Sequence, residues 1–219
     1  KEVIVKKFKI TGTDLFFAFQ IVMAWFFALP QISRMFESVE GVTINWLLCG
    51  QIFMILNLYL AYRVYQKNKR KETLQTFLIY LNWVILITPV VIITFLKCHW
   101  TNEDTLIFTM VMILAALVVT IGIIQGKGIS DPTVKGLLIG LFRIVPHLYL
   151  SYCIIQAGSS EGIAATSVWV ANVTANARII TLILTGRKIK WEKSIIASLL
   201  SEVGCEISWV IVTIVWVIY

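Results

Sequence analysis

Long apolar stretches alternate with short polar segments along the whole chain. Each apolar stretch is close to the roughly 20 residues that a helix needs to cross about 30 Å of hydrocarbon. Apolar residues occupy most faces of these stretches, which is typical of helices that are exposed to lipid or buried. The pattern predicts an all-α membrane protein with spanning helices at residues 14–36, 43–65, 74–97, 105–126, 134–157, 163–185 and 194–219.

The composition supports a membrane protein and gives no sign of an enzyme. Hydrophobic residues make up 58% of the 219 residues and charged residues 14%, with a mean hydropathy of +0.85. A soluble domain of this size could not bury so much apolar surface. The first stretch is too long for a cleaved signal peptide, so we expect a retained span. Without a phosphate loop, nucleophile elbow or metal-ligand spacing, we expect no enzyme activity, no cofactor and no metal.

The net charge of +7 is distributed unevenly between the loops. Lysine and arginine gather in alternate loops, which by the positive-inside rule are cytoplasmic. We therefore expect a multi-pass protein of the cell membrane with its N-terminus in the cytoplasm and its C-terminus outside. The partner of the basic loops would be anionic lipid rather than nucleic acid. The residues concerned are Lys6, Lys7, Lys9, Lys67, Lys69, Arg70, Lys71, Lys127, Lys135, Arg187, Lys188, Lys190 and Lys193.

One motif occurs twice in the chain. Pro30-Gln31 lies near the end of an apolar helix and is followed by Ser-x-Glu-Gly at 38–41; Pro146-His147 is followed by the same pattern at 159–162. The copies are separated by roughly 120 residues, which indicates two related halves. An even number of helices between the copies gives both halves the same orientation. In membranes, paired halves of this kind form transporters with the substrate site between them.

Superposing the motifs places spans 1–3 on spans 5–7. The fourth span carries no polar side chain larger than Thr or Met before Gln125, so we expect a linker helix. The predicted architecture is two parallel three-helix repeats in a 3+1+3 order. Residues 1–97 form the first repeat, 98–133 the linker helix and its loops, and 134–219 the second repeat.

The paired motifs resemble those of the PQ-loop family, which shares the fold of the SWEET sugar transporters. The resemblance covers the whole chain and implies facilitated or alternating-access transport of a small polar metabolite. It also implies hinge or gating roles for Pro30, Gln31, Pro146 and His147. The chain departs from the pattern in having His147 in place of Gln. Members carry sugars, cystine or cationic amino acids, and relatives of the fold include vitamin permeases and a receptor.

Four charged residues fall inside the predicted spans. Arg143, Arg178 and Glu202 lie eight or nine residues from the cytoplasmic end of their helices, a common depth of about 12–13 Å. Glu206 follows one turn deeper on the face of Glu202. Because an unpaired charge at this depth is costly, we expect a charge network of Arg143, Arg178, Glu202 and Glu206. The network could line a substrate site or only hold three helices together.

Amides and aromatic rings supply the rest of the predicted substrate site. The residues are Asn57, Asn82, Trp83, Asn172 and Asn176, together with Arg178, Glu202 and Glu206; Gln20 and Gln51 add two further amides. In sugar-carrying relatives, asparagines of the third and seventh helices bind the substrate, and Asn82 fits that pattern whereas Glu202 departs from it. Each Asn could instead make only a helix–helix hydrogen bond.

These features favour a transporter of a charged or zwitterionic metabolite such as an amino acid. A sugar or vitamin carrier of the same fold, or a receptor that binds a ligand without transporting it, are the alternatives. A homo-oligomer is left open. His147 is expected either to make activity depend on pH between about 5 and 8, because the unperturbed pKa of His is about 6.5, or to replace an amide as a neutral group.

Overall fold

The structure is a computed structural model that describes residues 12–189, 191 and 193–219. All regular elements among these residues are helices, and seven helices or continuous helical rods are long and apolar enough to cross a membrane, as the sequence predicts. The elements are α1 (Gly12–Glu37), α2 (Ile44–Lys67), α3 (Lys71–Lys97), α4 (Asn102–Ile124), α5 (Pro132–Ile139), η1 (Gly140–Ile144), α6 (Val145–Ala157), α7 (Ala165–Ile189) and α8 (Lys193–Ile218). Of these, η1 is a π-helical turn.

Helix starts follow from local side chains. The hydroxyl of Thr43 accepts from the Asn45 backbone N–H at the start of α2. Thr101 and Asp104 form a reciprocal capping box at α4, and the Asp131 carboxylate accepts from the Thr133 N–H before α5. Such caps satisfy amides that have no partner within the helix. They determine the starts of α2, α4 and α5, which lie within a few residues of the starts predicted from hydropathy.

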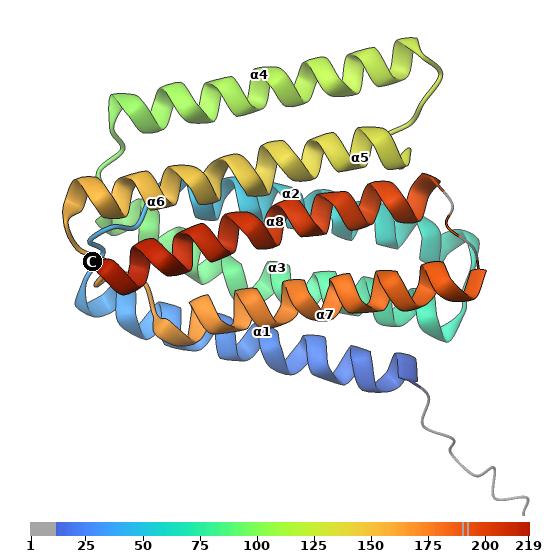
Figure 1. Ribbon diagram of the computed structural model, residues 1–219, viewed down its shortest axis with the longest axis horizontal. Coiled ribbons are helices and arrows are strands. Elements are labelled where there is room, and N and C mark those ends of the chain that lie inside the picture. Colours follow the sequence, from blue (N-terminus) through green and yellow to red (C-terminus); the bar gives the residue numbers. More distant parts are fainter. Residues whose placement is uncertain (1–11, 190, 192) are drawn as a thin grey trace, which may run out of the picture.

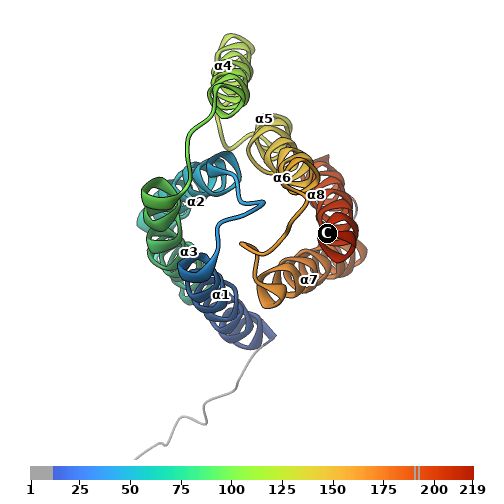
Figure 2. The same cartoon turned by 90° about the vertical axis from the view of Figure 1, so that its left-hand side faces the viewer.

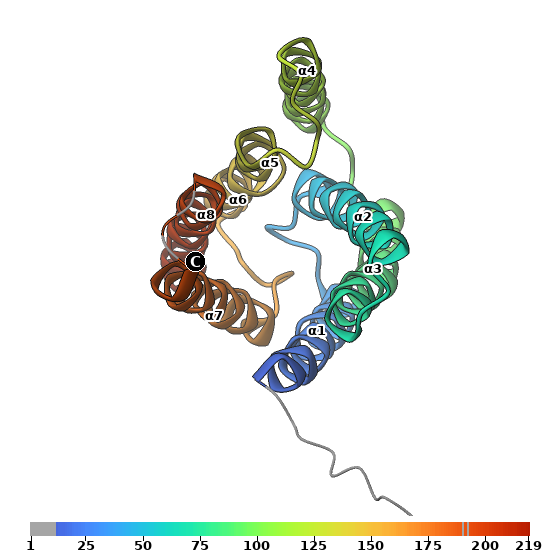
Figure 3. The same ribbon diagram turned by 90° about the vertical axis from the view of Figure 1, so that its right-hand side faces the viewer.

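The helices form two groups on either side of a central axis (Figures 2 and 3). In the first group, α1 and α2 both pack against α3; in the second, α7 and the rod formed by α5, η1 and α6 both pack against α8. The groups meet where α1 contacts α7 and where α2 contacts η1 and α6. Helix α4 lies outside both groups and touches α2, α5 and η1 (Figure 1).

The two ends of the bundle differ in their loops. One end, called the basic end, holds the start of α1 and the α2–α3, α4–α5 and α7–α8 connections (Figure 1). The opposite end, called the motif end, holds the α1–α2 and α6–α7 loops with the two Ser-x-Glu-Gly sequences. Figure 2 shows these two loops extending toward each other between the groups. Of the predicted cytoplasmic residues, Lys6, Lys7, Lys9 and Lys190 lie outside the described part of the chain.

Both motif prolines lie inside long helical rods. Pro30 lies inside α1, whereas Pro146 is the second residue of α6, directly after η1. Proline cannot donate a backbone hydrogen bond, and a π-turn widens the helix by one residue. The second rod therefore carries two consecutive irregularities, and the π-turn was not predicted from the sequence.

Candidate functional site

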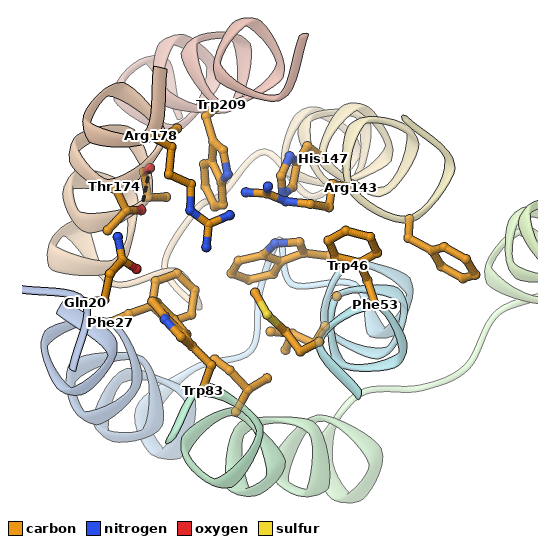
Figure 4. A pocket seen from close by; sticks show the side chains of 17 residues that line it. Gln20, Phe27, Trp46, Phe53, Trp83, Arg143, His147, Thr174, Arg178 and Trp209 are labelled. Carbon is orange, nitrogen blue, oxygen red and sulfur yellow. Dashed lines mark hydrogen bonds between the residues drawn. The ribbon is translucent and has the colours of Figure 1, made fainter. Parts of the chain in front are cut away.

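A central pocket of about 100 Å³ lies where the two groups face each other. Helices from both groups contribute to its lining, and the labelled side chains in Figure 4 point into it from all sides. The polar groups of its lining residues are one amide, one hydroxyl, one imidazole, two guanidinium groups and three indole N–H groups, and its largest side chains are aromatic. The lining includes Gln20, Phe27, Trp46, Trp83, Arg143, His147, Thr174, Arg178 and Trp209.

The aromatic rings form a connected wall of the pocket. Phe27 meets Trp46 and Trp83 edge-on, with ring centroids 6.3 Å and 5.7 Å apart. Trp46 of α2 meets Trp209 of α8 in the same way at 5.9 Å, which joins the two groups. Edge-to-face pairs of buried aromatic rings hold one another in place. The pocket thus offers a fixed apolar surface to a flat molecule.

The structure brings Arg143, Arg178 and Glu202 together. Arg143 Nη1 lies 3.3 Å from one carboxylate oxygen of Glu202, and Arg178 Nη1 lies 3.4 Å from the other. Glu202 is only 8% exposed, so its charge is neutralised inside the protein. The prediction that Glu206 belongs to this network is wrong: within the described residues it forms no ion pair with either arginine, and its Oε1 accepts from Asn176 Nδ2 at 2.6 Å.

Two polar side chains of the pocket are buried without a partner within the described residues. Neither atom of the Gln20 amide makes a hydrogen bond, and the indole N–H of Trp83 makes none. Gln20 is 1% exposed and Trp83 is 7% exposed. Buried polar groups are nearly always satisfied, so these groups indicate a place for water or a ligand.

A second cavity of about 350 Å³ adjoins the central pocket on the side of the basic end. The two share Gln20, Phe53 and Arg178 in their linings. The second lining extends to Thr13 and Glu72 in the first turns of α1 and α3. Together the cavities reach from the middle of the bundle to its basic end.

At the motif end, Gln31 connects the two groups. Its side-chain N–H donates to the Gly162 carbonyl at 2.8 Å, and its side-chain oxygen accepts from the Ala164 N–H at 3.0 Å. Ser167 adds a hydroxyl bond of 2.8 Å to the Phe27 carbonyl. Gln31 and Ser167 are both completely buried. These bonds close the motif end between α1 and the start of α7.

The motif glycines let the two loops approach each other closely. The Gly162 N–H donates to the Glu40 carbonyl at 2.9 Å, and a Cβ at Gly162 would lie 2.7 Å from that same oxygen. Gly41 has a φ of +75°, and a Cβ there would lie 2.5 Å from the Ser159 carbonyl oxygen. Arg34 also donates to the Glu161 carbonyl. Any side chain at either glycine would separate the loops.

His147 behaves differently from Gln31, although the two occupy matching motif positions. Its Nδ1 lies 2.9 Å from the Ser208 hydroxyl, and its ring lies 4.5 Å from that of Trp209. Both partners belong to α8 of the same group, so His147 does not bridge the groups. Its predicted effect on pH dependence stays a prediction.

The predicted asparagines are dispersed. Asn57 lines the second cavity and donates to the Phe53 carbonyl. Asn82 lies in a separate groove between α1 and α3. Asn172 donates to Thr213 of α8 at 2.9 Å, and Asn176 donates to Glu206. In the described structure, Asn82, Asn172, Asn176 and Glu206 are absent from the linings of both cavities, and the last three connect α7 to α8.

Sequence reasoning did not single out Phe27, Trp46 and Thr174, which line the pocket. The sequence does not show whether a lone aromatic residue or Thr in an apolar span faces the centre of the bundle or its outside.

No group of three or more His, Cys, Asp or Glu side chains that could hold a metal occurs among the described residues. Comparisons with family models, curated proteins and solved structures find no match for the chain.

Proposed function

We propose that the protein is a transporter that moves a small polar metabolite, charged or zwitterionic, through the centre of the bundle. The observation that supports this most is the one-sided path. A second cavity, which shares three lining residues with the central pocket, reaches the basic end, while hydrogen bonds of Gln31 close the motif end. A path open at one end and closed at the other is one state of an alternating-access cycle.

The proposal treats the two helix groups as parallel repeats in a 3+1+3 order, with α4 as the linker. The paired motifs support this assignment. So does the order of the helices, because α1 and the α5–η1–α6 rod each lead directly into one of the two motif loops. It also assigns the chain to the PQ-loop type of transporter, on the resemblance of the motifs.

Opening of the motif end would require the groups to separate near the Gly41 and Gly162 loops. Pro30 and the π-turn before Pro146 lie in the two helices that carry these loops, which makes them the proposed hinges. The bonds that must break are few and mostly to backbone groups, whereas α1–α3 and α7–α8 contacts within each group can stay intact. A rigid-body movement of this kind needs little change inside either group.

Cysteine accessibility in oriented membrane vesicles tests the cycle. Thr174→Cys, in the central pocket, is introduced into a variant with alanine at Cys98 and Cys153. A charged, membrane-impermeant thiol reagent is added to either face. A transporter exposes Thr174→Cys to both faces, whereas a receptor of this fold exposes it to one face only. Thr181→Cys, which lines only the second cavity, is the matched control and should react from the basic end alone.

A further inference from the structure

The charges around the central pocket do not balance. Its charged lining residues, within the described part of the chain, are Arg143 and Arg178. Their partner Glu202 lines the second cavity, and its two oxygens lie 3.3 Å and 3.4 Å from the two guanidinium groups. Counted over the ion-paired cluster of Arg143, Arg178 and Glu202, which leaves out Glu206 because it pairs with neither arginine in the described structure, two positive charges face one negative charge. Figure 4 shows both guanidinium groups pointing toward its middle.

Hydrogen-bond donors also outnumber acceptors in this pocket. Each guanidinium has five N–H groups, more than the bond to Glu202 uses. The Gln20 amide N–H₂ and the Trp83 indole N–H are buried without partners within the described residues. The Thr174 hydroxyl already donates to backbone carbonyls of its own helix. A ligand oxyanion would satisfy these donors, because charge-assisted bonds to Arg are the strongest of this kind.

An amine on the ligand finds no comparable partner. The carboxylate of Glu202 is already paired twice. Glu206 accepts from Asn176 through Oε1, and its Oε2 has no partner in the described structure, but Glu206 lies outside the lining of the central pocket. The Gln20 side-chain oxygen is an unpartnered acceptor in the described structure, but it is neutral. An ammonium group would therefore enter a pocket with surplus positive charge, which is unfavourable at low dielectric.

The rest of the pocket is suited to a flat apolar group. Phe27, Trp46, Trp83 and Trp209 form edge-on contacts that fix their ring planes. Aromatic rings arranged in this way bind planar ligands by stacking or edge contact. The donors of Arg143 and Arg178 lie beside this surface (Figure 4).

We infer that the substrate is an organic anion that carries a carboxylate on a planar ring and has no amine. The inference rests on the proposed function and narrows it, since it disfavours free amino acids. The carboxylate binds the N–H groups of Arg143, Arg178, Gln20 and Trp83, and the ring lies against the aromatic wall.

A set of matched small molecules tests the inference on the wild-type protein in detergent. Benzoate is compared with benzamide, benzylamine, phenylalanine and acetate, each at rising concentration, by the shift in melting temperature. Benzoate should stabilise most, because it alone combines the charge, the ring and the absence of an amine. Equal stabilisation by benzamide, or stronger stabilisation by phenylalanine or benzylamine, overturns the inference.

Variants locate the effect in the pocket. Arg178→Gln keeps the Arg143–Glu202 pair, so no carboxylate is left unpaired, and it should weaken benzoate affinity about 10- to 100-fold without changing that for benzamide. Trp83→Phe keeps an aromatic ring but removes the indole N–H together with the five-membered ring, and about tenfold weaker binding is expected. Arg63→Gln, on the exposed surface of α2, is the matched control and should leave affinity unchanged.

The outcome separates the inference from the proposed function. If Thr174→Cys reacts from both faces while benzoate fails to stabilise, the protein transports a different class of solute. If benzoate stabilises wild type and Arg178→Gln equally, the anion binds elsewhere and the assignment of the pocket is overturned.

Discussion

Replacing Gln31 by Leu removes the amide that joins the two helix groups while keeping a side chain of similar size. Gln31 is 0% exposed and makes one bond to the Gly162 carbonyl and one from the Ala164 N–H. In Gln31→Leu, the Gly162 carbonyl and the Ala164 N–H lose their partner as long as the motif end is closed. When the motif end opens, water can reach them. The substitution therefore destabilises the closed form selectively.

The size of the effect follows from these two bonds. Leaving a buried donor or acceptor without a partner costs about 1–3 kcal/mol. Two such groups shift the equilibrium between closed and open forms by about 2–6 kcal/mol. Even about 2 kcal/mol changes the ratio of open to closed molecules about 30-fold.

The assay is the rate at which Thr174→Cys reacts with an impermeant thiol reagent from the motif end. Gln31→Leu should raise this rate by at least about 30-fold as long as opening is rare. Gln51→Leu is the matched control. Gln51 donates to Thr88 at 2.9 Å and to the Val84 carbonyl, so its bonds lie within one group. This control should lower the melting temperature and leave the reaction rate unchanged.

An unchanged rate in Gln31→Leu would refute the view that this amide closes the path. Equal acceleration by Gln51→Leu would refute it as well, because general loosening of the bundle would then explain the result.

Further substitutions test other parts of the structure. Glu202→Gln leaves both arginines without their carboxylate and should destabilise the fold by about 3–5 kcal/mol, measured by denaturant unfolding; wild-type stability would contradict a structural pair. Gly162→Ala places a Cβ 2.7 Å from the Glu40 carbonyl oxygen and should speed motif-end labelling, unlike Gly128→Ala, whose nearest neighbour is 3.8 Å away. Burial and Asp104 raise the pKa of Cys98 to about 11, so its maleimide reaction should accelerate about tenfold per unit from pH 7 to 9; a plateau near pH 8.5 would contradict this.

The sequence was sufficient to predict the number of spans and the pairing of Arg143 and Arg178 with Glu202, but not the place of Glu206. Length and hydropathy determine where a helix crosses a bilayer, so the seven spans are confirmed. Arg143, Arg178 and Glu202 each lie eight or nine residues from the predicted cytoplasmic end of their helices. Because the rise per residue of a helix is constant, this count was enough to place the three side chains at one depth. The structure places these three side chains within ion-pair distance.

The rotation of each helix about its axis could not be predicted in the same way. Spans that are apolar on most faces have no marked polar side, so the sequence did not show that Asn82 faces a groove between α1 and α3, or that Asn176 and Glu206 bond to each other. The contact of Gln31 with Gly162 joins residues 131 positions apart, which no local pattern reveals. The π-turn likewise has no sequence signature in Gly140–Ile144.

The peripheral position of α4 has a consequence for how the chain could be divided. This helix contacts α2, α5 and η1, whereas the central pocket is lined by residues of the other helices. The covalent connection between the groups therefore runs around the site and not through it. Two separately synthesised polypeptides, cut in the α4–α5 connection, would retain every contact across the pocket, so a split protein should reassemble its site without a peptide bond between the halves.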